Sequence, residues 1–403
     1  MNEWRGAETP RVRAELVPPG PLDPAATLAP LAHGPRDPSF RLVPDGAWRA
    51  VHTASGGALV RLSWRRAPRP ATQERAAIDR RAGGTTRGIL LDPDRGDSVC
   101  IEAWGPGAED AAAQAPAWLG ARDDWSGFDA AGFASRLPET VAATRRVRPG
   151  LRLPSGGSLF DTLCAVILEQ RVTGTEAHYA WFRLVTRFGA PAPGPAPAAG
   201  SAGRAARLFL PPTPEAWRRI PSWEWHQARV DARRRDTLVR AAERASALAR
   251  VEGSVMAAGE VPAIGAPAAG QAGAPRPIGL AAATGAASAL GTPPELAGTQ
   301  RAAETLAGLE RALRSLPGIG VWTAAETLQR THGAPDHVSF GDFHVAHFVG
   351  QALTGRRADD AGMEALLAPF AGHRQRVVRL LQASGAKNPS YGPRLAPQEH
   401  RRH

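Results

Sequence analysis

The sequence predicts an α+β protein, with a small antiparallel-sheet domain followed by an all-α domain. Two observations support this class. Between residues 40 and 104, short segments rich in Val, Leu, Ile and Trp alternate with Gly and Asp turns, as strands of a sheet do. From about Leu151 onward, apolar residues recur at helical spacing instead. A chain of 403 residues is long enough for two or three domains with cores of their own.

The amino-terminal part is expected to hold an arm and the sheet domain. Residues 1–38 are rich in Pro, Ala and charge without periodicity, so we predict a disordered arm. The sheet domain is assigned to 39–145, with short helices near Asp110–Ala117 and Ala130–Leu137. Its expected strands are Trp48–Thr53, Ala58–Trp64, Gly88–Leu91 and Ser98–Trp104.

The helical domain is assigned to residues 146–390, followed by a tail over 391–403. Ser158 precedes an apolar run that predicts a helix over Leu159–Leu168, ended by Gly174. Further helices are expected over Thr175–Phe188, from Thr213-Pro214-Glu215 onward, and over the basic stretch Arg229–Leu248. Two Ala/Gly/Pro-rich stretches, near 190–206 and 251–299, are predicted to be flexible insertions.

Helical periodicity returns at Gln300 and is interrupted once by a glycine turn. Leu306, Leu309, Leu313 and Leu316 lie on one helical face. The turn Pro317-Gly318-Ile319-Gly320 follows, and Val321–Arg330 is again helical in pattern. A helix that begins after two glycines presents unpaired N–H groups and a positive dipole end, to which a phosphate can bind without a side-chain cation.

Composition narrows the classes of function. The net charge of +11 favours a polyanionic partner, nucleic acid first. The two cysteines, Cys100 and Cys164, are far apart, which excludes a thiolate zinc site or a four-cysteine cluster. No membrane-length apolar run or signal-peptide core is found, so we expect a cytoplasmic, nucleoid-associated protein without a membrane partner.

The string Leu316-Pro-Gly-Ile-Gly-Val-Trp-Thr-Ala324 resembles the hairpin of the helix-hairpin-helix DNA glycosylase superfamily. The loop Val338-Ser-Phe-Gly-Asp342, about twenty residues later, resembles the loop that carries the essential aspartate of that family. The resemblance implies that Asp342 is catalytic. A single fixed carboxylate suits the chemistry, because cleavage of an N-glycosidic bond builds positive charge on the sugar. Asp342 can equally be the N-cap of the next helix, expected over His344–Leu353.

Trp322 distinguishes two kinds of glycosylase. In bifunctional members the second residue after the last hairpin glycine is a lysine, whereas this chain has Trp322 and only a remote lysine, Lys387. We therefore expect hydrolysis without lyase activity. Tryptophan here matches the alkylpurine branch, the DNA-3-methyladenine glycosylase II type, where it lines the base pocket; an indole face attracts a cationic alkylated base. Four residues on, where that branch can carry a second aromatic, this chain has Glu326.

The resemblance extends to the first helices of the domain. Glu169-Gln170-Arg171-Val172 is similar to the family's glutamine-containing turn, in which the residue after the glutamine fills the space left by the flipped base. Arg171 is thus either the wedge or a solvated residue at a helix end. Tyr179 and Trp181 are assigned to the base pocket with Trp322 and Glu326. The assigned DNA contacts are Gln170, Arg171, Pro317, Gly318, Ile319, Gly320 and Thr323.

The sequence thus predicts a monomeric, monofunctional glycosylase that flips alkylated purines out of duplex DNA and hydrolyses them in base excision repair. No redox or organic cofactor is implied; from the family we expect a Na+ or K+ ion on hairpin carbonyls near Leu316 and Ile319. Two alternatives remain open. One is a non-catalytic helix-hairpin-helix DNA-binding protein, and the other is a glycosylase for another base lesion.

Overall fold

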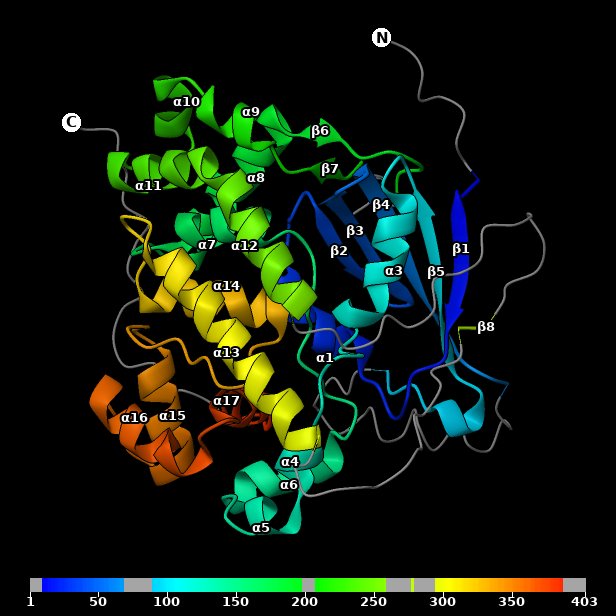
Figure 1. The fold of residues 1–403 in the computed structure, drawn as a ribbon, viewed down its shortest axis with the longest axis vertical. Helices are drawn as coiled ribbons and strands as arrows, with labels where there is room; N and C mark the ends of the chain where they lie inside the picture. The colour runs from blue at the N-terminus through cyan, green and yellow to red at the C-terminus, as the bar shows by residue number, and fades with distance from the viewer. Residues whose placement is uncertain (1–8, 69–88, 198–206, 259–276, 279–293, 387–403) are drawn as a thin grey trace.

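A computed structural model describes residues 9–68, 89–197, 207–258, 277–278 and 294–386. The α+β class is confirmed: a single large sheet lies beside a body of helices (Figure 1). Within the described ranges, no helix combines the length and the apolar character that crossing a bilayer requires. Three short 3-10 helices, η1 (Ala29–Leu31), η2 (Pro93–Arg95) and η3 (Ala368–Phe370), connect longer elements.

The sheet has the strand order β2-β3-β4-β5-β1-β8. All neighbours are antiparallel except β8, which runs parallel to β1. The predicted strands at 48–53, 58–64 and 98–104 are confirmed as parts of β3, β4 and β5. The strand bounds are β1 (Val12–Leu16), β2 (Phe40–Val43), β3 (Gly46–Thr53), β4 (Gly56–Arg65), β5 (Ser98–Trp104) and β8 (Pro277–Ile278).

The predicted arm over 1–38 is wrong for the part that the structure describes. β1 pairs along its whole length with β5, and α1 (Pro24–Leu28) follows it. Leu28 and Leu31 are buried in the core of the sheet, so burial of apolar residues outweighs the Pro- and Ala-rich composition. The predicted strand at 88–91 is also wrong, because Leu91 makes only an isolated bridge to Leu22. Residues 1–8 lie outside the described ranges.

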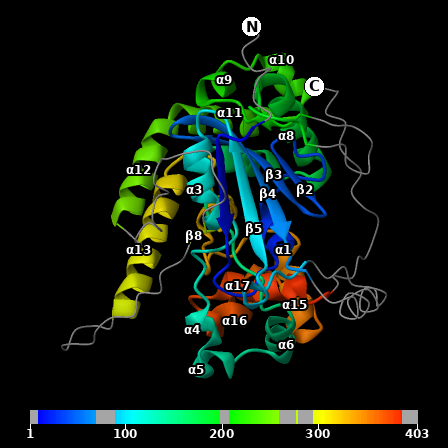
Figure 2. The same cartoon turned by 90° about the vertical axis from the view of Figure 1, so that its right-hand side faces the viewer.

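Each face of the sheet is covered by a different partner. Helix α3 (Ala108–Trp118) packs against one face (Figure 2) and shares a core with β1, β4 and β5. On the other face, Trp48 and Trp104 stack with ring centroids 5.8 Å apart and pack against the small hairpin of β6 (Ala190–Pro191) and β7 (Phe209–Leu210). The insertion predicted at 190–206 therefore begins as ordered structure; residues 198–206 lie outside the described ranges.

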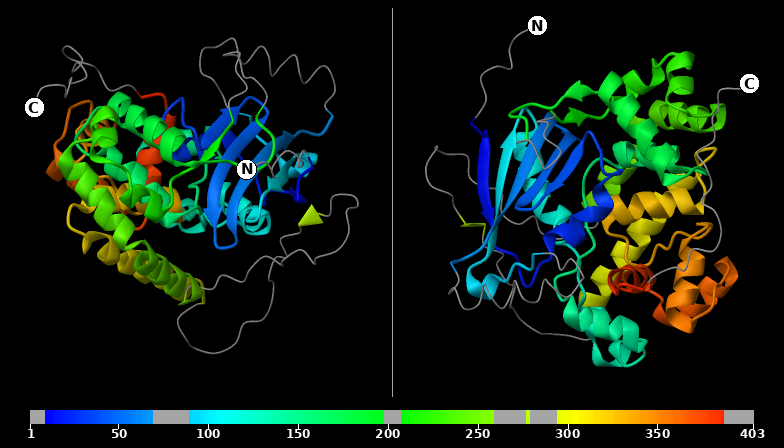
Figure 3. Two further views of the ribbon diagram at one scale, coloured as in Figure 1. Left: turned by 90° about the horizontal axis from the view of Figure 1, so that it is seen from above. Right: turned by 180° about the vertical axis from the view of Figure 1, so that it is seen from behind.

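The helices divide between two hydrophobic cores (Figures 1 and 3). The first core spans Leu159 to Ala334. It is built by α7 (Leu159–Glu169), α8 (Gly174–Phe188), α9 (Pro214–Arg218), α10 (Ser222–Gln227), α11 (Ala232–Glu243), α12 (Ala245–Ala258), α13 (Pro294–Arg314) and α14 (Val321–His332).

The second core joins helices from opposite ends of the domain. Its members are α4 (Ser126–Asp129), α5 (Ala131–Ala134), α6 (Glu139–Val147), α15 (Val345–Thr354), α16 (Asp360–Leu367) and α17 (Arg374–Ala383). Residues 125–147 thus share a core with the carboxyl-terminal helices rather than with the sheet, so the cores do not divide at the boundary predicted near 145. The loop that carries Asp342 joins the first core to the second.

Three helix boundaries differ from those predicted. α7 ends at Glu169, and Gly174 begins α8 instead of ending α7, because Thr173 and Glu176 form a reciprocal capping box. The basic stretch 229–248 is split at Arg244 into α11 and α12. The insertion predicted at 251–299 is wrong at both ends, where α12 continues to Ala258 and α13 starts at Pro294.

Candidate active site

The hairpin between α13 and α14 has the geometry that its glycines predict. Gly318 has φ +96, and a Cβ on it would lie 2.3 Å from Thr237 Oγ1, so the turn approaches α11 too closely for any side chain. Ile319 is buried among the helices of the first core. Gly320 is exposed, caps α14 and has no atom within 4 Å of a Cβ position. Val321, the first residue of α14, is 38% exposed, so the amino-terminal end of this helix, with its unpaired N–H groups, lies at the protein surface.

Gln170 ties the turn after α7 to this hairpin. Its Nε2 donates to the Gly318 carbonyl at 3.0 Å and to Thr323 Oγ1 at 2.9 Å. The next residue, Arg171, is exposed and has φ +56. A left-handed conformation is strained for arginine and persists only when neighbouring contacts hold it. The two bonds of Gln170 hold the residue directly before Arg171 against the hairpin.

Asp342 is held by three hydrogen bonds. Its Oδ2 accepts from Trp322 Nε1 at 3.1 Å. Its Oδ1 accepts from the backbone N–H of His344 at 2.8 Å and of Val345 at 3.0 Å. The N-cap of α15 is His344 rather than Asp342, but the Asp342 carboxylate accepts from the amides of that cap and of the first residue of α15. The same carboxylate is also fixed to the first turn of α14. The carboxylate is half-buried, while its neighbour Phe343 is 75% exposed.

Behind Asp342 lies a row of buried charges. Arg330 pairs with Glu326 at 2.9 Å and with Glu169 at 3.3 Å. Glu169 also contacts His33 Nδ1 at 3.3 Å. Ser339, in the Asp342 loop, donates its hydroxyl to Glu326. The carboxyl of Glu326 is therefore directed to Arg330 and Ser339.

The two carboxyls that share Arg330 shift in opposite directions. The pKa of Glu169 falls to about 2: burial alone would raise it, but Arg330 and His33 together outweigh burial. Burial raises the pKa of Glu326, and the negative charges of Glu169 and Asp342 act in the same direction. Glu169 is thus firmly ionised, and Glu326 is the carboxyl of the pair that takes up a proton first.

Tyr179 and Trp181, the other aromatic residues assigned to the base pocket, contact different partners. The Tyr179 ring is 5.1 Å from the Arg229 guanidinium. Trp181 is 2% exposed, stacks on Trp217 and donates its Nε1–H to Asp37. Trp181 is a core residue rather than an exposed aromatic of a cleft, so the structure contradicts its assignment to a base pocket at the surface.

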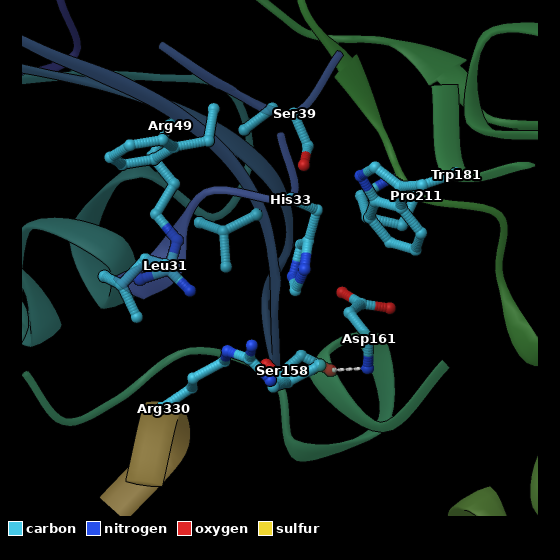
Figure 4. Close-up of a pocket in the computed structure, with 13 residues that line it drawn as sticks. Leu31, His33, Ser39, Arg49, Ser158, Asp161, Trp181, Pro211 and Arg330 are labelled. Carbon is cyan, nitrogen blue, oxygen red and sulfur yellow. Dashed lines mark hydrogen bonds between the residues drawn. The ribbon is translucent and has the colours of Figure 1, made fainter. Parts of the chain in front are cut away.

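A polar cavity between the sheet and the helices adjoins the buried charges of this site, with which it shares His33 and Arg330 (Figure 4). Arg49 and Asp161 lie on either side of His33 in this cavity, and Trp181 and Arg330 also line it. Burial lowers the pKa of Arg49 to about 10 and raises that of Asp161. Since Arg330 lies eight residues after Trp322 on α14, the cavity is about 12 Å along the helix from the Asp342 contact.

Some of these site residues could be predicted from local sequence patterns, and others could not. Glu326 and Arg330 are spaced i and i+4 on a helix, which predicts an ion pair. Glu169 stands directly before the glutamine turn, so its place near the hairpin follows from that of Gln170. Neither Ser339 nor His33 has a local pattern that points to the site, because each reaches it only through tertiary folding.

Comparison with known proteins bears on the fold. Neither a family model nor a curated protein sequence matches the chain. Among solved structures, the 3-methyladenine DNA glycosylase from Archaeoglobus fulgidus superposes with a TM-score of 0.55 at 14% identity, covering 93% of this chain and 98% of that one. The 8-oxoguanine glycosylase/lyase from Clostridium acetobutylicum gives 0.46 at 9% identity, covering 86% and 99%. The chain therefore shares the fold of the first of these structures, the 3-methyladenine DNA glycosylase.

Proposed function

We propose that the protein is a monofunctional DNA glycosylase that removes alkylated purines from duplex DNA in base excision repair. The observation that carries the proposal is the bond from Trp322 to Asp342, which joins a carboxylate to the first turn of the helix behind the glycine hairpin. We propose that the protein acts as a cytoplasmic, nucleoid-associated monomer.

The hairpin and the glutamine turn would hold the DNA. The N–H groups that follow Gly320 bind a phosphate, and backbone contacts of this kind act without regard to sequence. The exposed guanidinium of Arg171 fills the gap left in the base stack. Pro317, Gly318 and Ile319 shape the turn, and Gln170 and Thr323 fix it to α7.

Asp342 would stabilise the sugar as the bond to the base breaks. The electron pair of the C1′–N bond leaves with the base, and the sugar acquires oxocarbenium character that the fixed carboxylate stabilises. A water oxygen then bonds to C1′ and its proton passes to the carboxylate or to solvent. Because the hydrogen bonds to Asp342 exist before DNA binds, the charge is pre-organised.

Two features favour a cationic, alkylated purine. Glu326 and Glu169 are paired with Arg330, so the charge that favours a positive base is that of the Asp342 carboxylate. The half-buried indole of Trp322 offers an electron-rich face for stacking and cation–π contact. A base that already carries positive charge leaves without general-acid help, so one carboxylate suffices.

The side chain at position 322 argues against strand cleavage. A Schiff base needs an amine nucleophile, and Trp322 occupies the position after the hairpin where the resemblance places a lysine. Lys387 lies outside the described residues. We also propose that the carbonyls near Leu316 and Ile319 bind Na+ or K+; a carbonyl oxygen is a fitting ligand type, and each carbonyl keeps a second lone pair.

The test is a panel of duplexes, each with one defined lesion, assayed with the enzyme in excess. We expect release of 3-methyladenine and 7-methylguanine, an abasic site that stays uncut, and loss of base release with retained DNA affinity in Asp342→Asn. Asp94→Asn, an exposed aspartate of η2, is the matched control. Excision of another lesion alone would refute the alkylpurine assignment; binding without any release would favour the non-catalytic alternative.

A further inference from the structure

One face of α14 contacts the whole loop that carries Asp342. Trp322, Glu326 and Gln329 follow at spacings of four and three, so their side chains share that face. Trp322 donates to the Asp342 carboxylate, while Glu326 and Gln329 contact residues 337 and 339 earlier in the loop. The loop is therefore attached to α14 at three successive turns of the helix.

Ser339 is the central point of this attachment. Its hydroxyl accepts from Gln329 Nε2 at 3.0 Å and donates to Glu326 Oε1. Its carbonyl accepts the backbone N–H of Asp342 at 3.2 Å. Since a hydroxyl has one proton to donate, Glu326 is the acceptor that fixes the rotation of the Ser339 side chain. The position of Ser339 in turn sets where the Asp342 backbone begins.

Glu326 has little freedom to move. Arg330, one turn further along α14, holds its Oε2 at 2.9 Å. Glu169 on α7, Arg379 on α17 and Asp342 face it electrostatically. Only about 15% of its side chain is exposed. A carboxyl enclosed in this way is costly to bury, and its bonds to Arg330 and Ser339 offset that cost.

We propose that Glu326 is a positioning residue: its bond to Ser339, with Arg330 behind it, holds the loop in the register that presents Asp342 to the sugar. The inference rests on the proposed function and extends it to a residue with no direct contact to the reacting atoms. Removing the bond leaves Asp342 with its own three hydrogen bonds but lets its backbone shift. A misplacement of about 1 Å costs roughly a hundredfold in rate.

The kinetic test compares three variants under single turnover on 7-methylguanine duplex. We expect Glu326→Ala and Ser339→Ala each to slow base release by about 10- to 100-fold, with unchanged DNA affinity, and the double variant to be no slower than either. Glu326→Gln keeps an acceptor oxygen for Ser339 and should recover most of the rate. Glu364→Gln, an exposed glutamate on α16, is the matched control.

Hydrogen exchange at the amides of residues 342, 344 and 345 tests the same inference without activity. In the structure these three N–H groups are bonded within the loop. Faster exchange in Glu326→Ala but not in Glu326→Gln supports positioning. Unchanged exchange together with an unchanged rate overturns it, as does a Glu326→Gln variant as slow as the alanine variant. If the wild type releases no base, the proposed function fails, and the exchange data still decide the role of Glu326.

Discussion

We expect opposite effects when each of the two hairpin glycines is changed to alanine: Gly318→Ala should reduce stability, and Gly320→Ala should reduce DNA affinity. At Gly318, a Cβ would lie 2.3 Å from Oγ1 and 2.8 Å from Cγ2 of Thr237, and φ is +96. Thr237 cannot yield easily, because it is buried and its hydroxyl is bonded to the Arg233 carbonyl at 2.9 Å. Backbone strain of about 1–3 kcal/mol and overpacking of about 1–3 kcal/mol add to a loss of about 2–6 kcal/mol.

At Gly320 the same substitution meets no atom of the protein within 4 Å, and φ is −98. Its cost in stability is limited to the weaker capping by alanine, about 0.5–1 kcal/mol. If a phosphate binds at the amides in front of this residue, however, the added methyl group obstructs it. We expect Gly320→Ala to bind undamaged duplex DNA at least tenfold more weakly while it unfolds near the wild-type temperature.

The assay pairs urea unfolding with fluorescence anisotropy on a labelled duplex at fixed salt, since salt alters such affinities strongly. Gly318→Ala should lose stability, and Gly320→Ala should lose DNA affinity only. Wild-type affinity in Gly320→Ala would refute the assignment of this open space to a phosphate. Wild-type stability in Gly318→Ala would refute the close approach of the turn to α11.

Three further predictions concern the contacts around the hairpin. Trp322→Phe keeps an aromatic ring but removes the hydrogen-bond donor to Asp342. Because a hydrogen bond to a charged group is worth about 1.5–3 kcal/mol, single-turnover base release should fall roughly 10- to 100-fold. The control Trp223→Phe, at a 62% exposed site, should leave the rate of base release unchanged. Gln170→Ala removes both bonds that fix the wedge turn and should weaken DNA binding about tenfold; equal affinity would contradict that role. Glu169→Gln should lower the free energy of unfolding by up to about 3 kcal/mol at pH 7. Because the pKa of Glu169 is depressed to about 2, the stability that its carboxylate contributes is present above about pH 4.5 and is lost as the pH falls towards 2. Urea unfolding of the variant and of the wild type should therefore converge in acid.

The sequence predicted correctly those elements whose local apolar pattern matches the side chains that they bury in the fold. The strands at 48–53, 58–64 and 98–104 were confirmed because their apolar residues face the sheet core. Pro317-Gly318-Ile319-Gly320 was predicted to be a turn between two helices, and it is one, with Gly318 at φ +96. The arm over 1–38 failed because five residues of β1 carry too little pattern to be recognised, although pairing with β5 makes them part of the sheet.

At the site, the sequence identified residues by their place in a motif, but it did not predict the contacts that these residues make with other parts of the chain. Asp342 and Trp322 were both singled out, yet their mutual hydrogen bond follows from the fold alone. Glu326 was placed in the pocket by its spacing from Trp322, but its carboxyl is occupied by Arg330 and Ser339. Helical periodicity tells which face a residue occupies; it does not tell which group from another part of the chain meets that face.

The role of α14 explains why a glycine turn and an aspartate twenty residues apart can serve one reaction. The amino-terminal amides and the indole of Trp322 belong to the same first turn of this helix. Their separation is therefore set by backbone geometry rather than by side-chain flexibility. Since Trp322 holds Asp342 at 3.1 Å, a phosphate bound at the hairpin would stand at a fixed distance from the carboxylate, and the sugar between them would be positioned by binding alone.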